Sequence, residues 1–398
     1  MNLLRDGTWL TTQSILLYAR ALLLFEIAMF GFFAAGAHGL IVPLANPIST
    51  DFVSFYAAGS LADAGTPWLA YDRAAHHLAE QQATAPGIGY NYFYYPPVFL
   101  LICAALARLP YLVAYLTFQL ATLIPVFLLV RRIAHRVPTI LLLAFPPVFW
   151  TVGTGQNAFL TASLFAGGTL LIDRRPILAG LLLGALCYKP HFGLLIPVAL
   201  IAGGHWRSFI AAALSVGALV GASLALFGVE TWQAFLTASM GSQAVYTTRA
   251  IDLAGLASPF GALLVLGASP TVAYIGQGCA TLALLGIVWI VWRHSRDLPL
   301  RSAILLTATP LAVPVVMFYD LLLVGVGLAW LSRTGGPAPW RKTGIAVLFV
   351  LSLLAGNLDG DSKLLIAPLV ATGGFALAIA AWRSTVVAEV RTTAAVPA

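Results

Sequence analysis

Hydrophobic residues form long runs along the whole chain, and short polar turns separate one run from the next. A helix needs about 20 mainly apolar residues to cross a hydrocarbon core that is ~30 Å thick. Because such runs recur from the first 40 residues to the last 40, the pattern predicts an all-α polytopic membrane protein rather than a soluble domain with one anchor. The composition agrees, since 60% of the residues are hydrophobic and only 9% are charged.

The spacing of the runs predicts about twelve transmembrane helices. They are expected at residues 15–38, 110–130, 137–153, 157–172, 176–188, 192–204, 208–227, 271–292, 301–318, 320–333, 343–356 and 363–382. Two further runs are too short to cross. Residues 96–109 would give a helix of only about 21 Å at 1.5 Å per residue, and residues 258–268 are shorter still. We expect both to form interfacial or re-entrant helices.

Basic residues gather between these runs on one side of the membrane. The predicted cytoplasmic positions are Arg5, Arg131, Arg132, Arg136, Arg174, Arg175, Arg207, Arg293, Arg296, Arg301, Arg333, Arg341, Lys342, Arg383 and Arg391. Positive residues favour the cytoplasmic side, so both termini are predicted there and residues 39–109 form a long outer segment. The net charge of +7 therefore reports orientation, and no nucleic-acid partner is expected. One membrane domain is predicted over residues 1–398, with a core at about 45–330, C-terminal helices at 343–382 and a cytoplasmic tail at 383–398.

Asp51 lies where the first predicted span leaves the membrane, in a chain that has few charges. A tyrosine-rich stretch, "YNYFYYPPVF", follows in the same outer segment. Single tyrosines at this depth are typical of the aromatic belt of membrane proteins. So many of them ahead of two prolines instead predict a shaped wall, which suits sugars and isoprenoid phosphates. The tyrosines concerned are Tyr56, Tyr90, Tyr92, Tyr94 and Tyr95.

Polar residues also mark the outer ends of later spans. They are Gln156 and Asn157 in "GTGQNAF", Lys189 and His191 in "CYKPHF", Arg249 and Asp252 in "YTTRAIDLAG", and Tyr319 and Asp320 in "VMFYDLLL". Ionisable groups at such positions are costly and are usually functional, although Lys189 could simply extend its amine to the interface. His76 and His77 have no third ligand at suitable spacing. No nucleotide-binding motif is present either, so we expect neither a metal nor a cofactor.

Taken in order, these motifs resemble glycosyltransferase family 87. The similarity runs over residues 45–330 or so, through Asp-Phe-x-x-Phe-Tyr-x-Ala-Gly, Tyr-x-Tyr-Pro-Pro, Gly-Gln-Asn, Lys-Pro and Tyr-Asp. The family has a GT-C fold and includes polyprenyl-phosphate-mannose-dependent α-1,2-mannosyltransferases. The resemblance implies that Asp51 is the general base. The family often has a histidine just before its Tyr-Asp motif, where this chain has Phe318.

The resemblance implies a hexosyltransferase of the bacterial inner membrane. It would move a hexose, with mannose expected, from a polyprenyl-phosphate sugar to a glycolipid or glycan acceptor on the outer face, with inversion. Lys189 and Arg249 are expected to hold the departing phosphate, with His191 as a further candidate. Substrate contacts are expected from Tyr56, Tyr92, Tyr95, Gln156, Asn157, Tyr319 and Asp320. Two alternatives stay open at this point: a transporter or lipid flippase, and a non-catalytic assembly partner.

Overall fold

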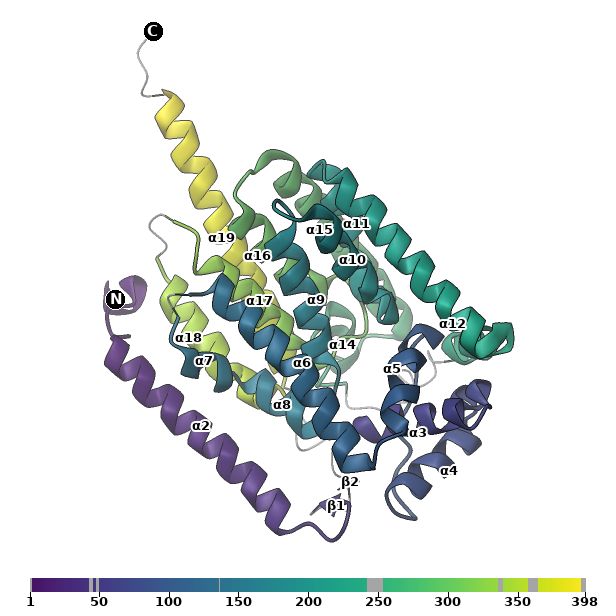
Figure 1. The fold of residues 1–398 in the computed structure, drawn as a ribbon. Coiled ribbons are helices and arrows are strands. Elements are labelled where there is room, and N and C mark those ends of the chain that lie inside the picture. The colour runs from purple at the N-terminus through teal and green to yellow at the C-terminus, as the bar shows by residue number, and fades with distance from the viewer. Residues whose placement is uncertain are drawn as a thin grey trace.

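The computed structural model describes residues 2–42, 46–47, 50–135, 137–241, 253–335, 339–356 and 364–394. They form an assembly made almost wholly of helices (Figure 1). Within these residues, five helices are long and apolar enough to cross a membrane. These are α2 (Thr12–Ala35), α6 (Tyr111–Ile133), α12 (Trp206–Gly241), α15 (Pro270–His294) and α19 (Ile366–Ala394). The all-α membrane class is confirmed, while the number of twelve crossings stays a prediction.

The other predicted spans are helical too, but shorter. They are α7 (Thr139–Leu143), α8 (Pro146–Thr154), α9 (Ala158–Leu171), α10 (Pro176–Gly184), α11 (Ile196–Ala202), α16 (Leu298–Ala308), α17 (Leu322–Leu331) and α18 (Arg341–Leu351). Proline causes several of the breaks, because it lacks an N–H and disfavours helix in the residue before it. The run expected at 137–153 is therefore two helices, and α8 begins at Pro146.

The long segment between α2 and α6 has its own helices. After the short strands β1 (Ile41–Val42) and β2 (Asn46–Pro47) come α3 (Phe52–Asp63), η1 (Pro67–Tyr71), α4 (Arg73–Ala83) and α5 (Pro97–Ala107). Helix α3 packs directly on α5. A Cβ at Gly59 would lie 2.1 Å from the carbonyl oxygen of Cys103, so only glycine permits this approach. Figure 1 shows α3, α4 and α5 grouped at one end of the molecule. The other short run forms α14 (Pro259–Val265).

Residues 312–317 are not helical, although a span was expected over 301–318. The helical run of α16 and η4 (Thr309–Leu311) ends early, in a stretch that contains Pro310 and Pro314. The chain then pairs with the segment before α14, because the Ala257 N–H donates to the Val316 carbonyl over 2.7 Å. The next helical turn is η5 (Phe318–Leu321), which carries Asp320. This early end therefore decides where Asp320 lies.

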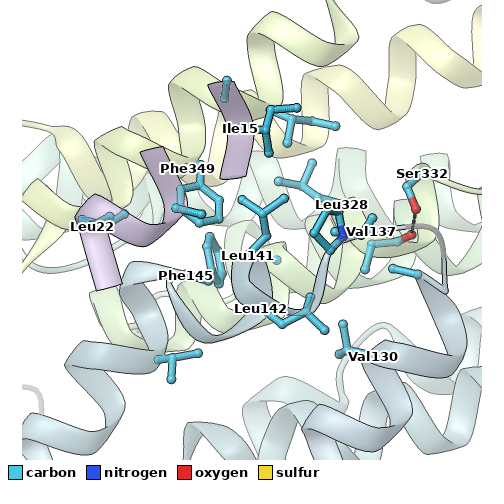
Figure 2. Close-up of a pocket in the computed structure, with 18 of the residues that line it drawn as sticks. Ile15, Leu22, Val130, Val137, Leu141, Leu142, Phe145, Leu328, Ser332 and Phe349 are labelled. Atoms are coloured by element: carbon cyan, nitrogen blue, oxygen red, sulfur yellow. Dashed lines mark hydrogen bonds between the residues drawn. The ribbon is translucent and has the colours of Figure 1, made fainter. Parts of the chain in front are cut away.

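An apolar cavity of ≈ 1040 Å³ lies between α2 and the helices α6, α7, α17 and α18. Figure 2 shows residues such as Leu22, Leu141, Phe145 and Phe349 lining it. Helix α2 runs along the edge of the molecule in Figure 1 and buries few side chains. None of the predicted site residues lines this cavity, although the basic residue Lys342 does. It is a lipid-like environment, separate from the polar site described next.

Candidate active site

Asp51 starts α3 and is joined by its backbone to the end of α8. Its N–H donates to the carbonyl oxygen of Thr154 over 2.9 Å. The side chain is partly buried. This single bond brings the acid from the segment between α2 and α6 next to Gln156 and Asn157, which lie between α8 and α9.

Gly155 makes the turn that presents those two amides. It has φ 73°, a left-handed conformation that glycine adopts without strain. The Gln156 N–H donates to the Thr151 carbonyl over 3.1 Å, and the Gly155 N–H donates to that of Val152 over 3.2 Å. This is a Schellman motif, which closes the end of α8. The sequence Gly-Gln-Asn therefore directs Gln156 back towards Asp51.

Gln156 has its side chain oriented by two donors. Its Oε1 accepts from the Tyr95 hydroxyl at 3.2 Å and from the Asn157 N–H at 3.1 Å. The amide nitrogen is thus left to donate to Asp51. Burial raises the pKa of Asp51 to about 6, against smaller lowering effects from the Gln156 hydrogen bond and the charge of Lys189. A carboxylate with a pKa near working pH is suited to general-base catalysis.

Lys189 and Asp320 form a buried ion pair beside this carboxylate. Lys189 stands between η2 (Ala185–Tyr188) and η3 (Pro190–Gly193), because Pro190 disfavours helix at the residue before it. Its Nζ donates to both Asp320 oxygens, at 2.8 and 3.0 Å. Only 6% of the Lys189 side chain and 3% of the Asp320 side chain are exposed. The pair joins two segments 131 positions apart in sequence.

The Lys189 amine is fully engaged. Its third donor reaches Asn157 Oδ1 at 3.4 Å, and the ammonium lies 4.8 Å from the Phe192 ring centre and 5.7 Å from that of Tyr319. An ammonium has three N–H donors, so a substrate phosphate would have to compete with Asp320. The structure therefore gives Lys189 a partner that the sequence did not indicate.

Two buried polar atoms near the pair have no hydrogen-bond partner among the described residues. They are Asn157 Nδ2 and His191 Nε2. His191 follows Lys189 by two positions, and its ring lies against Phe192. Buried donors and acceptors are normally satisfied. These two groups are candidates to bind polar atoms of a ligand.

The remaining predicted residues are distributed differently. The Tyr56 hydroxyl donates to the Leu109 carbonyl at 2.9 Å, which ties α3 to the start of α6. Tyr95 belongs to the site through Gln156, whereas the Tyr92 ring contacts Tyr90 and Tyr94. Arg249 and its neighbour Asp252 lie outside the described residues.

Sequence reasoning missed the hydrogen bonds that support the site. The Tyr188 hydroxyl lies 2.6 Å from Thr161 Oγ1, and Gln119 Nε2 donates to the Gln156 carbonyl at 3.3 Å. On α4, His76 Nε2 donates to the Ser54 carbonyl at 3.0 Å. The fully buried Glu80 accepts from the Asn91 N–H. An acid four residues after a histidine was the available signal, but sequence alone could not reveal that both are buried.

The fold and the site together define an all-helical membrane protein with a polar cluster at the end of its helices. Residues 93–318, more than half of the chain, match the model of glycosyltransferase family 87. The chain belongs to this family and is a membrane glycosyltransferase. This family match favours the enzyme interpretation over a transporter or flippase. No curated protein matches it, and no solved structure does. The matched region contains Tyr95, Gln156, Asn157 and Lys189, whereas Asp51 lies before it and Asp320 just after it.

Proposed function

We propose that the chain transfers a hexose, with mannose as the first candidate, from a polyprenyl-phosphate sugar to a glycolipid or glycan acceptor. The observation that carries this is the position of Asp51, which lies beside Gln156 and next to the Lys189–Asp320 pair. The family supplies the reaction class, and the site supplies a base and polar groups for it. No nucleic acid, metal or cofactor takes part in this scheme.

Asp51 acts as the general base. Its carboxylate takes the proton of an acceptor hydroxyl as that oxygen forms a bond to the anomeric carbon of the donor. The bond from the anomeric carbon to the phosphate oxygen breaks at the same time, and polyprenyl phosphate leaves with the bonding electrons. One base and one displacement invert the anomeric centre. The amide of Gln156 fixes the orientation of the carboxylate for this step.

The donor phosphate is held by polar groups next to Asp51. Asn157 Nδ2 and His191 Nε2 have no partner among the described residues, so they are available to the phosphate or to sugar hydroxyls. Lys189 places positive charge nearby and keeps Asp320 in position. Arg249 stays a predicted phosphate ligand. The short helices α5 and α14 are proposed walls for the isoprenoid tail. Tyr319, whose ring lies near the Lys189 ammonium, stays a proposed substrate contact.

The site is proposed to face the extracytoplasmic side of a bacterial inner membrane, where lipid-linked rather than nucleotide-linked sugars are the donors. The basic clusters support this orientation. A cysteine at Gln82, which is exposed on α4, should react with a membrane-impermeant maleimide added to intact cells. A cysteine at His135, after α6, should react only once the membrane is opened. The reverse pattern would place the site in the cytoplasm and contradict a lipid-linked donor.

The direct test is transfer by the purified protein in nanodiscs. Polyprenyl-phosphate mannose and polyprenyl-phosphate glucose are supplied as donors, with membrane glycolipid extracts as acceptors, and products are identified by mass spectrometry and NMR. The expected product has the anomeric configuration opposite to that of the donor. Transfer from a nucleotide sugar, with none from either lipid donor, would overturn the proposal.

A further inference from the structure

The apolar cavity between α2 and the helices α6, α7, α17 and α18 has a polar end. Apart from Tyr18 on α2, its polar lining residues all come from the segments where α2 and α18 begin and where α17 ends. They are Trp9, Thr12, Ser332 and Lys342, and we call this end the polar mouth. Figure 2 shows Ser332 at one end of the cavity and the apolar Leu22 at the other. A cavity with one polar end and a long apolar remainder matches the polarity of a membrane lipid.

Three hydrogen bonds fix the segment before α2 to the start of α18 at the polar mouth. Trp9 Nε1 donates to Thr343 Oγ1 over 3.0 Å, and that hydroxyl donates to the Leu4 carbonyl over 2.6 Å. The Trp340 N–H donates to the Arg5 carbonyl over 2.7 Å. A mouth held in this way is preorganised, which lowers the entropy cost of binding a ligand.

Lys342 is the cation of the polar mouth that is available to a ligand. Its stem lies against Gly7, where an added Cβ would come within 2.7 Å of Lys342 Cβ. The side chain is exposed, and its ammonium has no ion-pair or hydrogen-bond partner among the described residues. The neighbouring Arg341 is engaged, because its Nη1 donates to Thr334 Oγ1 over 2.7 Å. An anionic group at the mouth would therefore meet Lys342 first.

Basic residues outnumber acids in the described segments that surround the polar mouth. These segments span residues 2–12, 130–135, 328–335 and 339–346, and their basic residues are Arg5, Arg131, Arg132, Arg333, Arg341 and Lys342. Asp6 is their one acid. Trp9 and Trp340 are each more than a third exposed, and tryptophan is enriched at the level of lipid headgroups. Basic pockets between helices at this level attract anionic headgroups.

We propose that the cavity binds an anionic phospholipid, with its phosphate at Lys342 and its acyl chains between α2 and α18. The volume of ≈ 1040 Å³ is at the upper end of the roughly 300–1,000 Å³ that is typical of small-molecule sites, which leaves room for hydrocarbon chains. The chains gain van der Waals contacts with the apolar lining. The headgroup supplies the selectivity, because a zwitterionic lipid has no net charge to attract the basic mouth.

This lipid is a structural ligand and not a substrate. A donor or acceptor must bring its reacting group to Asp51, and none of the predicted site residues lines the cavity. Helix α2 buries only Ala19 and Glu26, so it makes few contacts of its own with the rest of the molecule. The bound lipid would join α2 to the neighbouring helices and so fix the start of the segment that leads to Asp51.

Lipid selectivity is measured by native mass spectrometry. Purified protein in a non-ionic detergent is mixed with equal amounts of phosphatidylglycerol and phosphatidylethanolamine, and wild type should retain one phosphatidylglycerol in preference. Lys342→Gln should weaken its binding by about fivefold, the effect of removing one cation near an anionic lipid. Arg293→Gln is the matched control, because Arg293 is exposed in the last turn of α15 and does not line the cavity. Equal retention of both lipids by wild type, or an equal loss in the two variants, would overturn the proposal.

Photocrosslinking tests where the lipid lies. A phosphatidylglycerol with a diazirine in one acyl chain should label peptides from α2, α7 and α18. Ala346→Trp, which places an indole in the cavity, should lose this labelling, and added phosphatidylglycerol should raise the thermal unfolding temperature of wild type but not of this variant. Labelling spread evenly over the outer faces of α12 and α15 would overturn the proposal. Preferential labelling of the same peptides by a polyprenyl-phosphate probe would also overturn it, and would assign the cavity to the donor.

Discussion

The two ends of α9 each have a buried cation, and the two cations are held in different ways. At the start of the helix, Lys189 is paired at 2.8 Å with an acid that is itself buried. Beyond its end, Arg301 lies 3.8 Å from Asp173, whose side chain is 47% exposed. Arg301 also contacts His205 at 3.3 Å and stacks over Trp292 at 5.1 Å. The 14 residues of α9 separate the clusters by about 21 Å at 1.5 Å per residue.

The two clusters differ in whether their acid can reach water and in whether a second carboxylate lies nearby. The Arg301 cluster joins the ends of several helices, and its acid can be solvated if the cation is lost. In the Lys189 cluster the acid is buried, so water could not solvate it if the cation were lost. This cluster also lies beside a second carboxylate, Asp51, which has no cation within ion-pair distance among the described residues. Two acids and one cation in a buried place favour chemistry over simple stabilisation. We therefore expect substitutions at the two ends to separate activity from stability.

The largest effect is expected from Asp51→Asn. This change keeps the size of the side chain and removes the base, so transfer should fall by about 10²–10⁴-fold while the protein inserts and purifies normally. Initial rates in nanodiscs measure it. Asp63→Asn is the matched control, because Asp63 ends the same helix in an exposed pair with Arg108 and such pairs contribute little. An Asp51→Asn enzyme at near wild-type rate, with Asp320→Asn inactive, would mean that Asp320 is the base.

The next effect is a loss of stability in Lys189→Met. Removing the cation leaves Asp320 buried and unpaired, which should lower the free energy of unfolding by about 3–5 kcal/mol. Fluorescence-detected thermal unfolding in detergent is the measurement. The double variant Lys189→Met, Asp320→Leu should recover most of the stability but little of the transfer. If the single variant unfolds at the wild-type temperature, the ion pair does not exist in solution.

A third expectation concerns pH. The ionised form of Asp51 is the base, and burial raises its pKa to about 6. Activity should therefore be constant above that pH and fall by about tenfold per unit below it, as the carboxylate takes up a proton. The pH dependence of kcat/KM tests this over pH 4.5–8, after controls for unfolding. A rate that is flat down to pH 4.5 would show that the carboxylate is not desolvated.

The smallest effect on activity is expected at the other end of α9. Arg301→Met should cost roughly 1.5–3 kcal/mol of stability, the range for hydrogen bonds to charged groups, because the exposed Asp173 is then solvated by water. The turnover of the folded enzyme should be unchanged, and so should the fall in its rate at low pH. Thermal unfolding and rates per folded molecule are compared directly with those of Lys189→Met. A drop in turnover as large as that of the Lys189 variant would make the two ends equivalent and remove the distinction.

The sequence predicted the helical membrane class because apolar runs and basic clusters are local signals. Those signals also predicted an outer segment, and they singled out Asp51, Gln156, Asn157, Lys189 and Asp320 as candidate site residues. These local signals could not predict which of the residues contact one another. The hydrogen bond from Asp51 to Thr154 and the pair between Lys189 and Asp320 depend on how distant segments pack, and one sequence carries no record of such contacts.

Helix ends were misplaced for a related reason. The run expected to continue to residue 318 stops at Leu311, because backbone pairing with residues 256–257 replaces the helix. A hydropathy pattern cannot distinguish an apolar residue in a helix from one in an extended segment buried in protein.

The distance in sequence between Lys189 and Asp320 has a consequence for biosynthesis. The chain is made from its N-terminus, so Lys189 enters the membrane well before its acid has left the ribosome. Until then an apolar hairpin holds an uncompensated ammonium, which is disfavoured in hydrocarbon and draws that end of the hairpin towards water. Once the turn that carries Tyr319 and Asp320 packs against this hairpin, the ion pair with Asp320 removes the cost of the unpaired ammonium. Asp320, the last residue of this pair to be synthesised, would then be the residue that lets the earlier helices pack.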